Sequence, residues 1–443
     1  MNKPLTVQEV PASYQVVMDS LPLRVGYKQT EVGVIPEDWH ARKLGDLASF
    51  RTGPFGSALH KSDYTHDGVP VINPMHMNDG QIVPSRSMTV TESAAAGFSE
   101  FRLKPNEVII GRRGDMGRCA VVQHEHLGWL CGTGSMIVRP SSGVDAEFLQ
   151  RILSSASVIS AIEETSVGST MINLNQGTLS GLVIQAPPLP EQRAIATALS
   201  DVDALLAAQD KLIAKKRDIK QATMQQLLTG KTRLPGFSGE WEVKRLGDVC
   251  WYQEGPGVRN TQFTKQGVKL LNGTNIAGGT IVLETTNRYI SEKEAFGSYK
   301  HFLVDDGDIL IASSGVTIDR FHEKVAFALL ENLPLCMNTS TIRFKVNETE
   351  LLDKFLYFFL QSDLFKEQIG KQATGSAQLN FGPAHLTKIN INLPLITDEQ
   401  TAIATILSDM DVEITALEQQ REKTRALKQG MMQELLTGRI RLV

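Results

Sequence analysis

The sequence is poor in cysteine and has no long apolar run. Its 443 residues contain four cysteines, Cys119, Cys131, Cys250 and Cys336, which lie far apart and form no C-x-x-C pair. This spacing argues against a disulfide framework or a zinc ribbon and is typical of a reducing compartment. The most apolar short run, Phe355–Leu360, is far too short to cross a bilayer, and the first residues lack the apolar segment of a signal peptide. We therefore expect a cytoplasmic protein with no membrane partner.

An excess of positive charge is also absent. The chain has 45 Lys and Arg against 49 Asp and Glu, a formal net charge of −4, whereas a nucleic-acid-binding protein that acts alone is usually basic. Hydrophobic residues (42%) and charged residues (21%) are at globular levels, which excludes a disordered or purely coiled-coil chain. The length predicts about two or three domains. If the chain binds DNA, local basic loops or a partner must supply the positive surface.

Catalytic signatures are missing too. Asn73-Pro74-Met75 matches the N-P-P-[FY] loop of adenine methyltransferases only in part, and no glycine-rich nucleotide turn follows a strand. Gly230-Lys231-Thr232 is not a P-loop, because Gln225 stands where the first glycine is needed. His124-Glu125-His126 has metal-ligand chemistry, but a turn before Leu127-Gly128 is the simpler interpretation. We predict a non-catalytic protein with no cofactor and no metal.

The chain does contain an internal repeat. The segments Glu191–Leu234 and Glu399–Leu442 align without gaps at an offset of 208, and 23 of their 44 positions are identical. Fainter matches precede each copy: DWHARKLGDL at 38–47 answers EWEVKRLGDV at 240–249, and VGSTMINLN at 167–175 answers TGSAQLNFG at 374–382. Between these anchors the two halves differ almost freely. The two halves therefore share a common framework of matching segments and differ in the residues between these segments.

The repeated segment has the hydrophobic spacing of a long helix. Steps of four and three residues connect Ile195, Leu199, Val202, Leu206, Gln209 and Ile213 in the first copy, and Ile403, Leu407, Met410, Ile414, Leu417 and Arg421 in the second. This spacing is that of a coiled-coil seam. Gly230 and Gly438 are placed as C-cap glycines. We expect two helices of about 38 residues, roughly 57 Å long, that pack on each other; the alternative is that each lies on its own domain.

The two remaining blocks predict mixed domains. Short apolar runs between Gly, Pro and Asn indicate strands at 69–72, 108–110, 136–138, 269–271, 309–311 and 341–344. One helical stretch is expected late in each block, at 146–160 and 351–368, and a final strand at 182–190 and 389–395. The fold class is therefore α+β, with two similar mixed α/β domains separated by two long antiparallel coiled-coil helices in an internal pseudo-twofold repeat.

We place the domain boundaries at the ends of the repeated segments. The divisions are an N-terminal extension at 1–30, a first domain at 31–188, a first helix at 189–235, a second domain at 236–395 and a second helix at 396–443. If the helices are antiparallel, the second returns toward the first block. Its end, LLTGRIRLV, would then lie near GVIPEDWHARKLGDL at the start of that block, and the chain would be nearly closed into a ring.

Together these motifs resemble the specificity (S) subunits of type I DNA restriction-modification systems. The resemblance rests on GVIPEDWHARKLGDL, PPLPEQRAIATALSDVD, LLTGKTRLPGF and the Gly-Ser and Leu-Asn elements before each helix, and it extends from about Gly26 onward. It implies that each block is a target-recognition domain that reads half of a split double-stranded DNA sequence. It also implies that the helices are a spacer and a dock for two methyltransferase subunits, with two restriction (motor-nuclease) subunits completing the complex.

The candidate DNA contacts lie in loops that differ between the blocks. In G-R-R-G-D-M-G-R, Arg112, Arg113 and Arg118 have the chemistry to reach phosphates or a guanine edge, although a solvated loop with an Arg–Asp pair fits equally well. The matching loop of the second block is polar rather than basic. The remaining candidates are Ser313, Ser314 and Arg320 in that loop, Lys61, Arg259 and Asn260 in early loops, and Ser169, Thr170 and Ser376 in the Gly-Ser elements.

Other recurring residues are interpreted as framework. Trp39 and Trp241 occupy matching places and are expected to anchor the core, and Asn173 and Asn380 are expected to form framework hydrogen bonds. Two alternatives to DNA recognition remain. The missing motifs argue against a nuclease or methyltransferase. The divergence of the blocks argues, less decisively, against a coiled-coil scaffold whose blocks bind protein.

Overall fold

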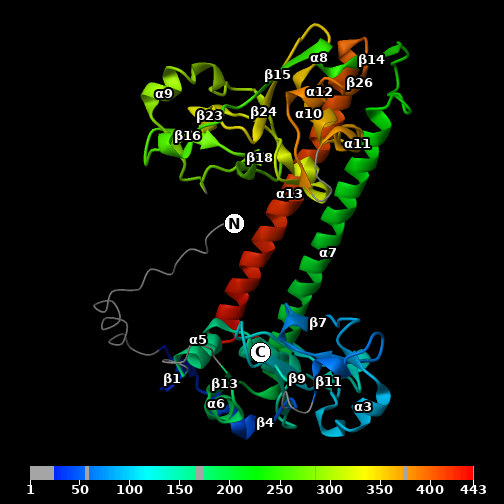
Figure 1. Ribbon diagram of the computed structural model, residues 1–443. Helices are drawn as coiled ribbons and strands as arrows, with labels where there is room; N and C mark the ends of the chain where they lie inside the picture. Colours follow the sequence, from blue (N-terminus) through cyan, green and yellow to red (C-terminus); the bar gives the residue numbers. More distant parts are fainter. Residues whose placement is uncertain (1–23, 55–58, 166–172, 285, 374–377, 443) are drawn as a thin grey trace. The chain divides into compact units, whose positions relative to one another are not determined.

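The computed structural model describes residues 24–54, 59–165, 173–284, 286–373 and 378–442 (Figure 1). The chain forms two compact units. Unit 1 comprises Met1–Ala208 with Arg421–Val443, and unit 2 comprises Gln209–Gln420. Each unit therefore contains one mixed domain together with a part of both long helices.

Unit 1 is built on small sheets. The largest has the antiparallel order β10-β9-β12-β4, from Cys119–Val121, Val108–Gly111, Ser135–Pro140 and Ala48–Thr52. A second sheet has the order β11-β5-β8, from Leu130–Cys131, Val69–Ile72 and Thr89–Val90, with β11 parallel to β5. Three pairs complete the strands: β1–β2 (Tyr27–Thr30, Gly33–Pro36), β6–β7 (Met77–Asn78, Gln81–Ile82) and β3–β13 (His40–Lys43, Val183–Ala186).

The helices of unit 1 are short. They are α2 (Leu44–Leu47), α3 (Glu92–Ala96), α4 (Ala146–Leu153), α5 (Ala156–Glu164) and α6 (Gln176–Gly181), with 3₁₀ turns η1 (Lys61–Asp63), η2 (Pro74–His76), η3 (Ser99–Phe101) and η4 (His124–His126). The main core lies between β9, β12 and α4. Leu199 of one long helix and Leu435 of the other close this core from outside the domain.

Unit 2 repeats this plan. Its main sheet has the order β15-β24-β20-β22, from Cys250–Glu254, Thr341–Val346, Ile309–Ala312 and Val325–Phe327. Its second sheet is β19-β16-β23, from Tyr289–Ile290, Val268–Leu271 and Leu335–Met337. The pairs are β14–β26 (Trp241–Arg245, Asn390–Pro394), β17–β18 (Ile276–Ala277, Thr280–Ile281) and β21–β25 (Val316–Thr317, Gln378–Leu379). The strand orders match those of unit 1, which confirms the predicted internal repeat.

The helices of unit 2 follow the same order. They are α8 (Leu246–Val249), α9 (Glu292–Phe296), α10 (Asp353–Gln361), α11 (Asp363–Gln372) and α12 (Pro383–Leu386), with 3₁₀ segments η5 (Asn260–Gln262), η6 (Gly273–Asn275), η7 (Lys300–Phe302), η8 (Ile318–Lys324) and η9 (Leu330–Asn332). Phe344, Phe355 and Phe359 fill the core between β24 and α10. Met224 and Leu407 of the long helices pack against it, as their counterparts do in unit 1.

The stretches predicted to be helical late in each block are helical, but each consists of two helices. In unit 1 Ser155 has an extended backbone conformation, and its side chain accepts a hydrogen bond from the backbone N–H of Val158. In unit 2 Ser362 does the same for Phe365. A serine in this position satisfies a free N–H at the start of a helix. Each serine therefore begins a second helix where the apolar pattern alone indicates continuity.

Two helices of 39 residues dominate Figure 1, α7 (Leu189–Leu227) and α13 (Thr397–Leu435). All the seam residues named from the sequence are buried or half-buried. Gly230 and Gly438, which follow the helices, have φ values of +69° and +71°. This left-handed conformation is the one that ends a helix and that glycine adopts without strain, so both glycines are C-caps as predicted.

Cross-helix ion pairs show that the two helices are antiparallel. In unit 1, Asp203 of α7 pairs with Lys428 of α13 at 2.5 Å. In unit 2, Lys220 of α7 pairs with Asp411 at 2.6 Å, and Lys216 pairs with Glu413 at 2.5 Å. As the residue numbers of the paired side chains rise along α7, those of their partners on α13 fall, so the two helices run in opposite directions. At the repeat offset of 208 the first two pairs are equivalent, so each unit contains one copy of the same contact.

Candidate nucleic-acid interface

One loop position has the same backbone environment in both units. In unit 1 the backbone N–H of Arg112, directly after β9, donates to Gly134 O, and its carbonyl accepts from Leu174 N, both at 2.9 Å. In unit 2 Ser313, directly after β20, donates to Ser340 O and accepts from Phe381 N, again at 2.9 Å. Arg112 and Ser313 are therefore equivalent. The framework holds the backbone of this position while its side chain differs.

The three arginines of the unit 1 loop have different surroundings. Arg112 is half-buried: its Nε donates to Leu174 O at 2.8 Å and its Nη2 to Asn173 Oδ1 at 3.3 Å. Burial, with a smaller contribution from the charge of Arg113, lowers the pKa of Arg112. Arg118 is paired with Asp115 at 2.7 Å. Arg113 is exposed, and it is the best placed of the three to reach a ligand.

The unit 2 loop is held by an asparagine. Asn380 Oδ1 accepts from Ser314 Oγ and from the backbone N–H of Gly315, both at 2.9 Å. Together with the bond from Arg112 to Asn173, this confirms that both asparagines form framework hydrogen bonds. Ser313 is buried, and its Oγ has no hydrogen-bond partner among the described residues. Arg320 lies further along in η8 and pairs with Glu323 at 2.6 Å, and this hydrogen bond raises the pKa of Arg320.

The other sequence candidates are scattered. Arg259 and Asn260 are exposed at the start of η5, where the backbone N–H of Arg259 donates to Gln262 Oε1. Lys61 begins η1, and its side chain is outside what the structure describes. The candidates Ser169, Thr170 and Ser376 lie outside the described residues. A DNA role for all these residues stays a prediction.

A cluster of three side chains around a buried carboxylate anchors the start of each domain. We call Trp39, Glu191 and Arg441 the unit 1 clasp. Trp39 Nε1 donates to Glu191 Oε2 at 2.7 Å, and Arg441 donates to both oxygens of the same carboxylate, at 2.6 and 2.8 Å. Trp39 and Glu191 have no solvent exposure. The end of the chain therefore lies against the start of the first domain, as the antiparallel topology predicts.

Unit 2 has the same cluster, the unit 2 clasp, formed by Trp241, Glu399 and Arg233. Arg233 donates to the two oxygens of Glu399 at 2.7 Å each, and Trp241 Nε1 donates at 3.3 Å. Glu399 is 1% exposed. Both tryptophans are therefore structural anchors. In unit 2 the arginine precedes the domain in sequence, whereas in unit 1 it is supplied by the C-terminal segment.

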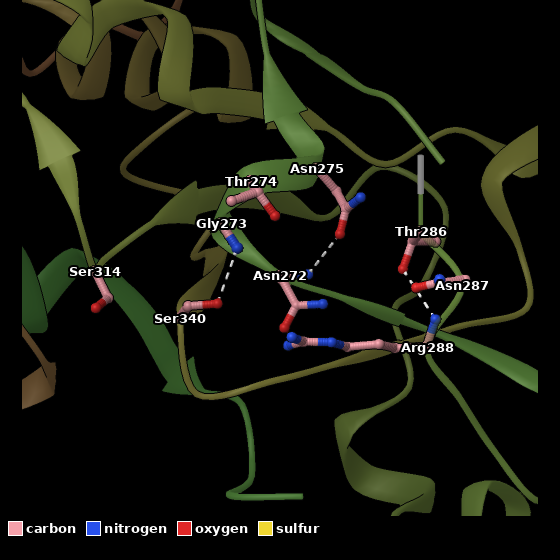
Figure 2. Close-up of a pocket in the computed structure, with 9 residues that line it drawn as sticks. All are labelled: Asn272, Gly273, Thr274, Asn275, Thr286, Asn287, Arg288, Ser314 and Ser340. Carbon is pink, nitrogen blue, oxygen red and sulfur yellow. Dashed lines mark hydrogen bonds between the residues drawn. The ribbon is translucent and has the colours of Figure 1, made fainter. Parts of the chain in front are cut away.

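Unit 2 has a polar surface hollow that the sequence did not indicate (Figure 2). A pocket of about 380 Å³ is lined by Asn272, Gly273, Thr274, Asn275, Thr286, Asn287, Arg288, Ser314 and Ser340. A neighbouring pocket of about 370 Å³ shares Ser314 and Ser340 and also contains Ser313 and Glu254. Burial raises the pKa of Glu254. Two of the predicted residues, Ser313 and Ser314, thus lie together in this region.

Unit 1 has a pocket of different composition. It measures about 350 Å³, and its lining includes Arg118, Asp115, Arg151 and Lys428. Among the described residues no group of three or more His, Cys, Asp or Glu is arranged to hold a metal ion. His124–His126 forms the turn η4, in which the buried His126 accepts a hydrogen bond from the backbone N–H of Gln123 through Nδ1. In the same part of the chain no helix is long and apolar enough to span a membrane.

The comparisons with known proteins agree with this duplicated architecture. The type I restriction modification DNA specificity domain matches this chain twice, at residues 36–215 and 238–425. The chain is therefore a protein with two DNA specificity domains. The MjaVIII specificity subunit of Methanocaldococcus jannaschii is 25% identical over 92% of this chain and 94% of its own length. The specificity subunit MjaX of the same organism is 25% identical over 94% of this chain and 97% of its own length.

Solved structures share the fold. A chain from a structure of type I restriction-modification complex assembly has a TM-score of 0.57 at 17% identity, over 92% of this chain and 99% of that one. The S subunit from M. genitalium has a TM-score of 0.52 at 16% identity, over 94% and 98%. The chain belongs to the family of type I restriction modification DNA specificity proteins, and as such it is a non-catalytic specificity subunit.

Proposed function

We propose that the chain recognises a bipartite, asymmetric sequence in double-stranded DNA, with one domain for each half-site. We further propose that it docks two methyltransferase subunits and, through them, two restriction subunits. In this proposal the helices α7 and α13 set the distance between the half-sites. The chain itself selects the DNA sequence, and its partners carry out the chemistry.

The observation that carries the proposal is the exchange of side chains on a constant framework. Arg112 and Ser313 form the same backbone hydrogen bonds, but their side chains differ in chemistry: one is a cationic guanidinium and the other a small neutral hydroxyl. The η2 turn ends in His76 and the equivalent η6 turn in Asn275, and each side chain accepts a backbone hydrogen bond three residues back. Base-edge recognition requires different side chains for different sequences on one docking geometry. Two such domains in one chain therefore favour an asymmetric, two-part target.

Exposed apolar residues on the helices support the docking of two partners. Leu212 and Ile219 lie seven residues apart on the unit 2 part of α7, and both are 41% exposed. The repeat counterpart of Ile219 is Leu427, which is 59% exposed on the unit 1 part of α13. Apolar residues on one face of a helix suit a helix-packing partner. Both units thus have an exposed apolar residue at this repeat position, Ile219 in unit 2 and Leu427 in unit 1, in keeping with two methyltransferase subunits.

Genome-wide adenine-methylation mapping tests the proposal. The chain is expressed with its neighbouring methyltransferase in a host that lacks methylation, and the same is done after exchanging residues 31–188 or 236–395 for those of a related subunit. We expect a split motif in which each exchange replaces one half-site only. If an active methyltransferase gives no split motif, or if an exchange leaves both halves unchanged, the proposal is wrong.

A further inference from the structure

The polar pocket of unit 2 contains an arginine, Arg288, whose guanidinium has no hydrogen-bond or ion-pair partner among the described residues. Arg288 precedes β19, and Figure 2 shows its side chain extended across the pocket toward Asn272. The residue is exposed, and no hydrogen bond or ion pair joins its guanidinium to any described residue. Its guanidinium carbon lies 5.5 Å from the centre of the Phe263 ring. By contrast, Arg320 of the same unit is neutralised by Glu323.

The backbone holds Arg288 in a defined place. Its carbonyl accepts from the backbone N–H of Leu270 at 3.0 Å, and its own N–H donates to Thr286 Oγ1 at 3.5 Å. Cation–π attraction holds a guanidinium against the face of an aromatic ring, and the N–H groups in the guanidinium plane can still donate hydrogen bonds. Arg288 is therefore pre-oriented and keeps its hydrogen-bonding capacity for a ligand.

The walls of the pocket are fixed by hydrogen bonds. Asn272 Oδ1 accepts from Asn338 Nδ2 at 3.0 Å, and the backbone N–H of Asn272 donates to Asn275 Oδ1 at 3.0 Å. Ser340 Oγ accepts from the backbone N–H of Gly273 at 2.9 Å. In the adjoining pocket the buried Ser313 Oγ has no described partner. The pocket is thus a polar surface fixed by hydrogen bonds, which contains a guanidinium with N–H groups available to a ligand and lies beside a hydroxyl that has no hydrogen-bond partner among the described residues.

Unit 1 has no such fork at the equivalent position. The backbone N–H of Val71 in β5 donates to Met88 O, just as Leu270 in β16 donates to Arg288 O. Met88 therefore occupies the place of Arg288. A thioether cannot donate hydrogen bonds. Of the two equivalent positions, only that of the second domain has an arginine, as expected for a residue that distinguishes the two half-sites.

We infer that Arg288 reads a guanine in the half-site of the second domain. Its guanidinium donates two hydrogen bonds, to O6 and N7 at the major-groove edge, which is the pairing that the fork matches best. This inference rests on the proposed function and assigns one specificity-determining residue within it. The sequence offered no signal for it, because a single Arg in TTNR resembles any surface turn.

The first test maps methylation with the variants Arg288→Ala and Arg288→Lys in the complex with the methyltransferase. We expect Arg288→Ala to lower discrimination at one guanine of the second half-site by about 5- to 150-fold, with every other position and the first half-site unchanged. Arg288→Lys should keep binding but lose part of the discrimination, because an ammonium lacks the fork. Arg245→Ala is the matched control, since Arg245 is also exposed in unit 2 but does not line the pocket.

The second test removes one acceptor from the DNA. Duplexes carry 7-deazaguanine in place of each guanine of the second half-site in turn, and binding of the complex is measured. The wild-type complex should lose affinity at one guanine, and the Arg288→Ala complex should be insensitive there. A uniform loss of methylation with no relaxed position would make Arg288 a phosphate contact and overturn the inference, as would an unchanged motif. A wild-type chain that yields no split motif would instead overturn the proposed function itself.

Discussion

The unit 1 clasp gives the sharpest test of how the fold is closed. Replacing Arg441 by methionine keeps most of the aliphatic stem but removes the guanidinium that bonds both oxygens of Glu191. Glu191 has no solvent exposure and would keep only the hydrogen bond from Trp39. Removing one partner of a buried pair costs about 3–5 kcal/mol. We expect about 3 kcal/mol, the lower end of this range, because the Arg441 side chain is 27% exposed and water can replace part of it.

The expected signal is a shift in thermal unfolding. For a unit of roughly 150–250 residues, 1 kcal/mol corresponds to about 2–4 °C in Tm, so Arg441→Met should lower the unit 1 transition by about 6–12 °C in scanning calorimetry of the full chain. Arg233→Met should act equally on unit 2, because Glu399 is buried in the same way. Arg439→Met is the control. Arg439 is 58% exposed and bonds Glu434 at 3.3 Å, so its loss should cost less than about 1 kcal/mol.

A second substitution separates charge burial from lost packing. Glu191→Gln removes the buried charge but leaves an amide oxygen for the N–H of Trp39. In the Arg441→Met background it should therefore restore part of the lost stability. If Arg441→Met is no more harmful than Arg439→Met, or if the double variant is as unstable as the single one, the clasp does not close unit 1 in this way.

Three other measurements test the helix length, the charge and the buried histidines. Inserting four helix-forming residues after Leu228, directly beyond the end of α7 at Leu227, extends this helix by about 6 Å, so methylation mapping should find a longer gap between unchanged half-sites; an unchanged gap would refute the spacer role. With a net charge of −4, the chain alone should bind target DNA far more weakly than the methyltransferase complex in fluorescence anisotropy at matched salt. Burial lowers the pKa of His76 and His126, which accept backbone hydrogen bonds as neutral rings. A lowered folded-state pKa makes unit 1 lose stability as pH falls below about 6.5. Changing both histidines to asparagine, as at Asn275 and Asn332 of unit 2, should abolish this loss in thermal unfolding.

The sequence correctly predicted several strands and the two long helices, because each of these elements depends on the residue pattern of its own segment. The apolar runs at 69–72 and 309–311 are strands β5 and β20, because a buried strand needs only a short β-forming run between turn residues. The long helices followed from their 4-3 spacing. The break at Ser155 was missed, since a serine between two apolar stretches does not reveal whether its side chain caps a new helix.

The candidate site depends on contacts between distant residues and was predicted less completely. Arg112 was named for its charge, but its bonds to Leu174 and Asn173 join residues about sixty positions away. Arg288 was missed for the same reason, because its ring contact with Phe263 and its place beside Asn272 arise only after β16 and β19 pair. Sequence therefore indicates which loops vary between the domains, while the fold decides which of their side chains stay free.

The repeat explains why these loops are free to vary. Two sets of framework contacts occur twice at the same offset: Asp203 with Lys428 matches Asp411 with Lys220, and the two clasps correspond residue by residue. Within each unit, these contacts join a residue of the first repeat copy to a residue of the second, so a change at one residue has to fit its partner in the other copy. The residues of these contacts are therefore constrained in pairs. Arg288 and Met88, or Arg112 and Ser313, lie outside these contacts, so either domain can change its content while the helices and clasps that carry it stay intact.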